Sequence, residues 1–136
     1  MQVASGVVCH VRIYKSAWFA KFARKEDLND SMLRNAVKRA ENGLIDAQLG
    51  NGLIKQRVAR AGSGKSGGYR TLIFFRDGQR AVFAFGFAKS SQANLDSEEL
   101  AVFRKAATII LGLSQAQIDA EVAAGAMMEV SGDDDV

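Results

Sequence analysis

The sequence predicts an α+β protein, with helices toward both ends of the chain and antiparallel strands in the middle. Apolar residues recur at helical spacing in the first and last thirds of the chain. Between them lie short runs rich in β-branched and aromatic residues, separated by glycine-containing loops, as in a strand meander. A chain of 136 residues with 48% hydrophobic residues is long enough for one ordinary core. We therefore expect a single domain over residues 1–130 and a disordered acidic tail at 131–136.

The N-terminal third is expected to contain one short strand and two helices. Residues 7–13 are rich in β-branched types and are predicted as a strand or an extended lead-in. Aromatic residues recur at helical spacing over 16–24, which predicts the first helix. The second helix is expected to be capped by Asp30 or Ser31 and to continue to Asn42, directly before a glycine.

The middle of the chain is expected to form an antiparallel meander of three strands. Asp77-Gly78 is a strong hairpin signal, because both residues tolerate the positive φ that a type I′ turn requires. A two-residue loop at this point would pair Arg76 with Gln79. The strands are expected at 53–60, 69–76 and 79–88.

The C-terminal third returns to a helical pattern. Asp96 or Ser97 is expected to cap a third helix, and Gly112 is expected to end it. A last helix is predicted over 114–124. The apolar stripe of the third helix consists of Leu100, Phe103, Ala107 and Ile110.

Positive charge is concentrated in the middle of the chain. The formal net charge is +3, yet residues 44–91 carry eight basic and only two acidic side chains. A basic stretch of this kind favours a polyanionic partner such as a nucleic acid. The alternative, from charge alone, is the solvated face of an ordinary protein.

Several other classes of protein fit the sequence poorly. The single cysteine, Cys9, cannot form an internal disulfide, and we identify neither a signal peptide nor an apolar run long enough to span a bilayer. We therefore expect a cytoplasmic protein with no membrane partner.

Cys9 and His10 are the only cysteine and histidine, so we expect no metal site and no cofactor. Gly64-Lys65-Ser66 resembles the end of a phosphate-binding P-loop, but Ala59 replaces the required glycine and a strand follows instead of a helix.

The basic strands remain as the candidate site. A ribonuclease that uses two histidines is excluded because the chain has one, so RNA chemistry would fall to lysine, arginine, tyrosine or carboxylates. Period-two geometry places Lys55 and Arg57 on one face, and the expected hairpin places Arg70 opposite Phe85 and on the same face as Lys89. Converging cations can bind a phosphate, stabilise charge on a pentavalent phosphorane and lower a lysine pKa toward that of a useful base. The alternative is that they bind a nucleic acid without cutting it.

The amino-acid sequence resembles the RelE/HigB-like toxin family from about Trp18 to Val130. The most specific segment is Gly64-Lys-Ser-Gly-Gly-Tyr-Arg70. The other segments that carry the resemblance are Phe22-Ala-Arg-Lys25, Gly43-Leu-Ile-Asp46, Ile54-Lys-Gln-Arg-Val-Ala-Arg60, Phe87-Ala-Lys89, Leu113-Ser-Gln-Ala-Gln117 and Ala124-Gly125.

The resemblance implies a small curved antiparallel sheet, packed with N-terminal and C-terminal helices. It also implies a toxin that enters the ribosomal decoding site and cuts mRNA without a metal, and that is neutralised by a cognate antitoxin. By position, the resemblance implies that the catalytic residues are Lys55, Arg57, Arg70 and Lys89, with Lys55 as general base or positioning group and the others stabilising the phosphorane. The residues expected to bind RNA are Arg60, Lys65 and Tyr69.

The chain departs from the family pattern after the late lysine. Some members have an arginine directly after it and a tyrosine several residues later, whereas this chain has Ser90-Ser-Gln92 and then Leu95-Asp96. Tyr69 or Phe87 is therefore a candidate for stacking on a base, with a core role as the alternative for Phe87. Two other functions remain open: a gyrase-directed toxin of the related ParE type, and a nucleic-acid-binding module without toxic activity.

Overall fold

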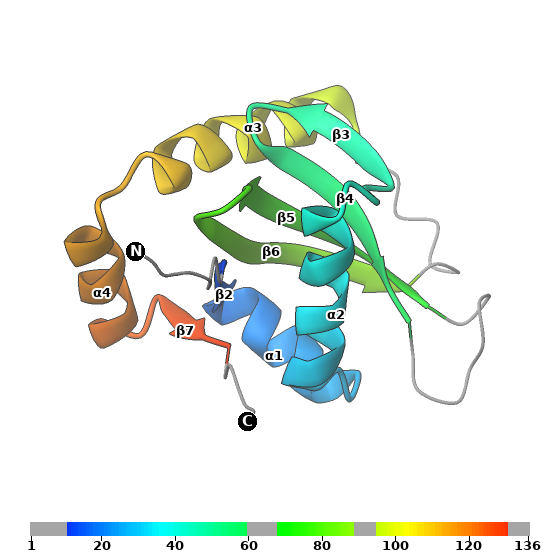
Figure 1. The fold of residues 1–136 in the computed structure, drawn as a ribbon, viewed down its shortest axis with the longest axis horizontal. Helices are drawn as coiled ribbons and strands as arrows, with labels where there is room; N and C mark the ends of the chain where they lie inside the picture. Colours follow the sequence, from blue (N-terminus) through cyan, green and yellow to red (C-terminus); the bar gives the residue numbers. More distant parts are fainter. Residues whose placement is uncertain (1–10, 60–67, 89–94, 131–136) are drawn as a thin grey trace, which may run out of the picture.

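The computed structural model describes residues 11–59, 68–88 and 95–130, which form one six-stranded sheet and helices on both its faces (Figure 1). The strand order is β3-β4-β5-β6-β2-β7. The strands are β2 (Arg12–Ser16), β3 (Ala47–Gly50), β4 (Leu53–Val58), β5 (Tyr69–Arg76), β6 (Arg80–Ala88) and β7 (Met127–Glu129). The helices are α1 (Ala17–Lys25), α2 (Asp30–Glu41), α3 (Ser97–Leu111) and α4 (Gln115–Ala123).

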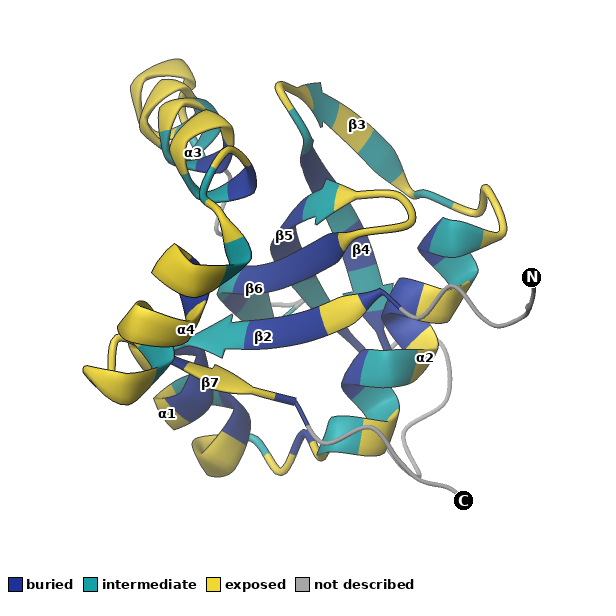
Figure 2. Ribbon diagram, turned by 60° about the vertical axis from the view of Figure 1, so that its left-hand side comes forward, coloured by how far each residue is buried: buried dark blue, intermediate teal, exposed yellow. Residues whose placement is uncertain are grey.

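The N-terminal and C-terminal helices pack on opposite faces of the sheet, which confirms the predicted α+β class. Helices α1 and α2 cover one face, where Phe19 and Leu33 pack with Ile73 of β5. Helix α3 covers part of the other face, where Leu111 packs with Leu72. Figure 2 shows that most of β6 and the middle of β2 are buried, while α3 keeps an exposed outer surface.

Three of the predicted strands are present, but the hairpin register was predicted wrongly. The β5–β6 turn contains three residues, so Arg76 pairs with Arg80 and not with Gln79. Only Gly78 adopts a positive φ, of 78°, whereas a type I′ turn would need positive φ at Asp77 as well. The N–H of Gln79 donates to the carbonyl of Arg76 at 3.0 Å and closes the turn.

Two short edge strands and one parallel pairing were not predicted. Strand β3 pairs with β4 across a turn at Asn51-Gly52, a dipeptide that is itself a hairpin signal. Strand β2 begins at Arg12, later than the predicted strand at 7–13, and it runs parallel to β6. Residues 7–10 and the acidic tail at 131–136 lie outside the described residues.

The helices begin and end close to their predicted positions. The side chain of Ser16 caps α1, and Asp96 forms a reciprocal capping box with Glu99 at the start of α3. The second helix differs, because Asn29 accepts the N–H of Met32 and is the cap in place of Asp30 or Ser31. In the described part of the chain, no helix is long and apolar enough to cross a membrane.

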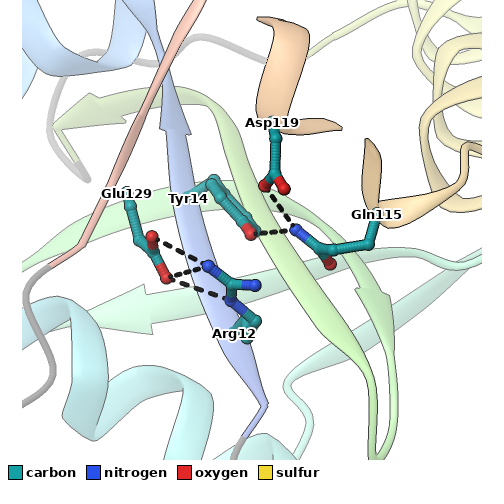
Figure 3. A network of polar contacts seen from close by, with 5 residues as sticks. All are labelled: Arg12, Tyr14, Gln115, Asp119 and Glu129. Atoms are coloured by element: carbon teal, nitrogen blue, oxygen red, sulfur yellow. Dashed lines mark hydrogen bonds and ion pairs between the residues drawn. The ribbon is translucent and has the colours of Figure 1, made fainter. Parts of the chain in front are cut away.

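A polar network fastens the last strand to the sheet (Figure 3). The guanidinium of Arg12 donates to the carboxylate of Glu129 at 3.0 to 3.1 Å, which joins β2 to β7. These bonds raise the pKa of Arg12 above its ordinary value. The amide of Gln115 donates to the hydroxyl of Tyr14 and to Asp119, each at 2.9 Å, so α4 is tied to the same place.

Candidate nucleic-acid interface

Three of the four cations predicted to be catalytic lie on one face of β4 and β5. Cross-strand partners in an antiparallel pair point to the same side of the sheet. Arg57 of β4 lies opposite Arg70 of β5, and Lys55 lies opposite Leu72 in the neighbouring row. The structure therefore brings Lys55, Arg57 and Arg70 together, in a group that we call the cation row.

Strand β6 places an aromatic side chain beside the cation row. Arg70 pairs with Phe87 of β6, whereas the sequence predicted Phe85 as its partner. The prediction was wrong by two residues because the turn is one residue longer and the register shifts once more between Leu72 and Ile73. Phe87 is half-buried beside the cation row.

The cation row belongs to the face that α3 covers, but it lies beyond the apolar core of that face. Leu72 is buried in that core together with Leu111 of α3. Lys55, Arg57 and Arg70 are each only half-buried. The same face thus changes from a packed core to a partly open cationic surface.

The side chains of the cation row form no ion pair within the described residues. None of the three side chains forms a salt bridge with a described carboxylate. The Nη1 atom of Arg70 is enclosed and has no hydrogen-bond partner in the described structure. Like charges placed directly opposite each other destabilise a strand pair, and a buried donor without an acceptor is also unfavourable. A bound anion would relieve both penalties.

Tyr69 lies on the other face of the sheet. It is 2% exposed, and its hydroxyl donates to the carboxylate of Glu26 at 2.7 Å. The ring of Phe22 meets it edge-on at 5.7 Å. A ring in this position cannot stack on an RNA base, so the structure does not place Tyr69 with the cation row.

The sequence predicted Phe87 as a candidate for stacking on a base, but not the aromatic surface around it. The rings of Phe85 and Phe87 are 6.2 Å apart, and Trp18 of α1 stacks on Phe85 at 4.5 Å. Trp18 is 48% exposed, although its spacing predicted an ordinary apolar position of a helix. No local sequence signal places it there, because it reaches β6 where β2 has ended and given way to α1.

The remaining predicted residues are not part of the described structure. Lys89, Arg60 and Lys65 fall in its gaps, as do the serines and glutamine that follow Lys89. Cys9 and His10 also lie outside the described ranges. Within those ranges, no group of three or more metal-binding side chains occurs.

Comparison with known proteins identifies the family. A search of curated proteins finds no match. A family profile described as the RelE toxin of the RelE / RelB toxin–antitoxin system matches residues 11–130. That span covers nearly the whole chain, including the cation row and all the described helices and strands. The chain therefore belongs to the RelE toxin family.

Proposed function

We propose that this toxin is an endoribonuclease that cuts mRNA on the ribosome and so inhibits translation. Family membership identifies the chain as a toxin of a toxin–antitoxin system. The observation that supports cleavage is the cation row, in which Arg57 and Arg70 face each other without a carboxylate partner in the described structure. A phosphodiester that becomes more negative in its transition state is the ligand such a row would favour.

The proposed reaction is an attack of the 2′-hydroxyl on the adjacent phosphate. The 2′-oxygen loses its proton to a general base and bonds to phosphorus, which forms a pentavalent phosphorane. The bond to the 5′-oxygen then breaks, and that oxygen takes a proton from a general acid. The products are a 2′,3′-cyclic phosphate and a free 5′-hydroxyl, so all atoms and protons balance.

The cations divide these tasks according to their chemistry. Arginine keeps its charge and offers a rigid fork of donors, so Arg57 and Arg70 are suited to hold the phosphorane oxygens. Lys55 is assigned the base or positioning role, and Lys89 is assigned a stabilising role with them. Of the two aromatic candidates for stacking on a base, we retain Phe87, because it lies directly beside Arg70 whereas Tyr69 is buried.

The partners follow from the same proposal. Membership of a RelE/RelB-type system implies a cognate antitoxin of the RelB kind. We propose that the antitoxin supplies carboxylates to the cation row and thereby blocks it, and that the toxin acts on ribosomes and mRNA in the cytoplasm.

The proposal is tested by inducing three proteins in bacteria that lack the antitoxin: the wild type, Arg70→Ala and Arg76→Ala. Arg76 is exposed at the far end of the same strand, so it controls for the loss of one arginine. We expect growth arrest and new mRNA 5′ ends within translated codons for the wild type and Arg76→Ala, and neither for Arg70→Ala.

Other results would point to other functions. Growth arrest without new mRNA ends, accompanied by trapped cleaved DNA, would replace the nuclease proposal with gyrase inhibition. Arrest and cleavage by Arg70→Ala at the wild-type level would remove Arg70 from the site. A wild type that neither arrests growth nor cuts mRNA would leave a chain that only binds.

A further inference from the structure

Within the described residues, no strand pairs with the outer edge of β4 at Arg57. Strand β3 pairs with Leu53, Ile54 and Lys55, and the pairing stops there. An open strand edge exposes unpaired N–H and C=O groups and allows the strand to shift. Arg57, the cross-strand partner of Arg70, therefore lies at a point of β4 that β3 does not reach.

Two charged side chains bond to the backbone of Arg57 where the pairing with β3 has ended. The carboxylate Oδ2 of Asp46 accepts the backbone N–H of Arg57 at 2.6 Å. The guanidinium Nη2 of Arg39, from α2, donates to the backbone carbonyl of Arg57. Both backbone groups of Arg57 are thus held by ionic partners, which form stronger hydrogen bonds than neutral ones.

A buried amide fixes Asp46 in turn. Gln56 is fully buried, and its Oε1 accepts the backbone N–H of Asp46 at 3.0 Å. Its Nε2 donates to the carbonyls of Leu44 and Ala36 at 2.9 and 3.0 Å. The segment that carries Asp46 is therefore bound to β4 and to α2 at several points.

We propose that Asp46 and Arg39 are positioning residues for the cation row. They hold the backbone of Arg57 so that its guanidinium stays beside that of Arg70, although the two like charges repel each other. This inference rests on the proposed nuclease function. We assign neither residue a contact with the substrate. The carboxylate of Asp46 bonds to the backbone of Arg57 and forms no described ion pair with a cation of the row. The row stays open to a phosphate.

The geometry explains why a carboxylate suits this position. Asp46 brings a negative charge next to Arg57, which lowers the repulsion within the row without blocking the guanidinium. An asparagine at the same position can still accept the N–H through its side-chain oxygen. An alanine cannot, and it would leave the N–H of Arg57 without its acceptor.

The test compares Asp46→Ala and Asp46→Asn with the wild type, and uses Glu121→Ala as the control. Glu121 is exposed on α4, and its substitution removes the same charge. The first measurement is residue-resolved amide hydrogen exchange. We expect faster exchange at Arg57 in Asp46→Ala, unchanged exchange at Leu53, and recovery of protection in Asp46→Asn.

The second measurement is the single-turnover rate of mRNA cleavage on programmed ribosomes. For Asp46→Ala we expect a loss of roughly tenfold or more, the size expected for a small displacement of a catalytic group. The ribosome concentration for half-saturation should change by less than about twofold, because binding is retained. Asp46→Asn should recover most of the rate, and Glu121→Ala should cleave as the wild type does.

Each outcome decides the inference. Wild-type cleavage by Asp46→Ala, or failure of Asp46→Asn to recover the rate while Arg57 remains protected, would overturn it and leave the nuclease proposal intact. A wild-type protein that cuts nothing on the ribosome would overturn both.

Discussion

Gly86 determines how closely α1 approaches the sheet. A Cβ atom at this position would lie 2.7 Å from Cε2 of Phe22 and 3.0 Å from Cε1 of Phe19. Real side chains do not approach this closely, so the rings or the helix would have to move. We expect Gly86→Ala to lower the free energy of unfolding by about 1–3 kcal/mol, as overpacked cores do. Urea denaturation measures this difference, in an Arg70→Ala background that we expect to be non-toxic.

The same site offers an internal control. Phe22→Leu removes the ring that is closest to the added methyl group, so Gly86→Ala should cost less in a Phe22→Leu background. Equal costs in both backgrounds would mean that the clash with Phe22 is not the cause.

Single residues also show how far the sequence could specify the site. The alternation of β-strands correctly placed Lys55 and Arg57 on one face. The partner of Arg70 could not be derived, because a turn of three residues and a register shift depend on the local path of the backbone. The burial of Tyr69 against Glu26 depends on α1, which is distant in sequence, and no local pattern reports it.

Strand β7 lies at the edge of the sheet and has few contacts with it. Among the described strands it pairs only with β2, and the ion pair between Arg12 and Glu129 joins their side chains at 3.0 Å (Figure 3). Both side chains are 45% exposed, so solvent screens the pair. For Glu129→Gln we expect a global loss of less than about 1 kcal/mol. Amide exchange should nevertheless speed up at Val130, whose N–H donates to Ile13.

The control for this element is Asp119→Asn, which weakens the contact of Gln115 within α4 but leaves the Arg12–Glu129 pair. Exchange at Val130 should then stay as in the wild type.

The titration of Arg12 adds no pH dependence to the stability of the fold near neutrality. The pKa of Arg12 is raised by its bonds to Glu129, so the stabilisation is complete below the ordinary pKa of an arginine and is lost only as the pH rises through the folded-state pKa. A large fall in global stability in Glu129→Gln would contradict this description.

The elements that the sequence did not predict share a physical cause. Strands β3 and β7 have four and three residues, too few for an alternating pattern to stand out. Each forms by pairing with the edge of a longer strand: β3 pairs with β4, and β7 pairs with β2. The parallel pairing of β2 with β6 likewise depends on the whole sheet. The longer helices and strands carry their own periodicity and were predicted with nearly correct bounds.

At the scale of the whole molecule, the distribution of charge matters more than its total. The net charge is only +3, but the central region, with eight basic and two acidic residues, includes strands β4, β5 and β6. Binding to the ribosome should therefore weaken as salt increases, because each phosphate contact releases counterions. The cation row should contribute to this dependence, whereas a basic residue at the far end of the sheet should contribute little.

The matched pair Arg57→Gln and Arg76→Gln tests this prediction, since both remove one positive charge from the sheet. Arg57 lies in the cation row, and Arg76 is at the end of β5 about 20 Å from Arg70, counted at the usual rise of a strand. Ribosome affinity is measured at several KCl concentrations, and the logarithm of the association constant is plotted against that of the salt. We expect Arg57→Gln to reduce the slope by about one and Arg76→Gln to leave it unchanged. Equal slopes for the two variants would mean that the ribosome responds to the overall charge of the toxin, and that the cation row makes no phosphate contact of its own.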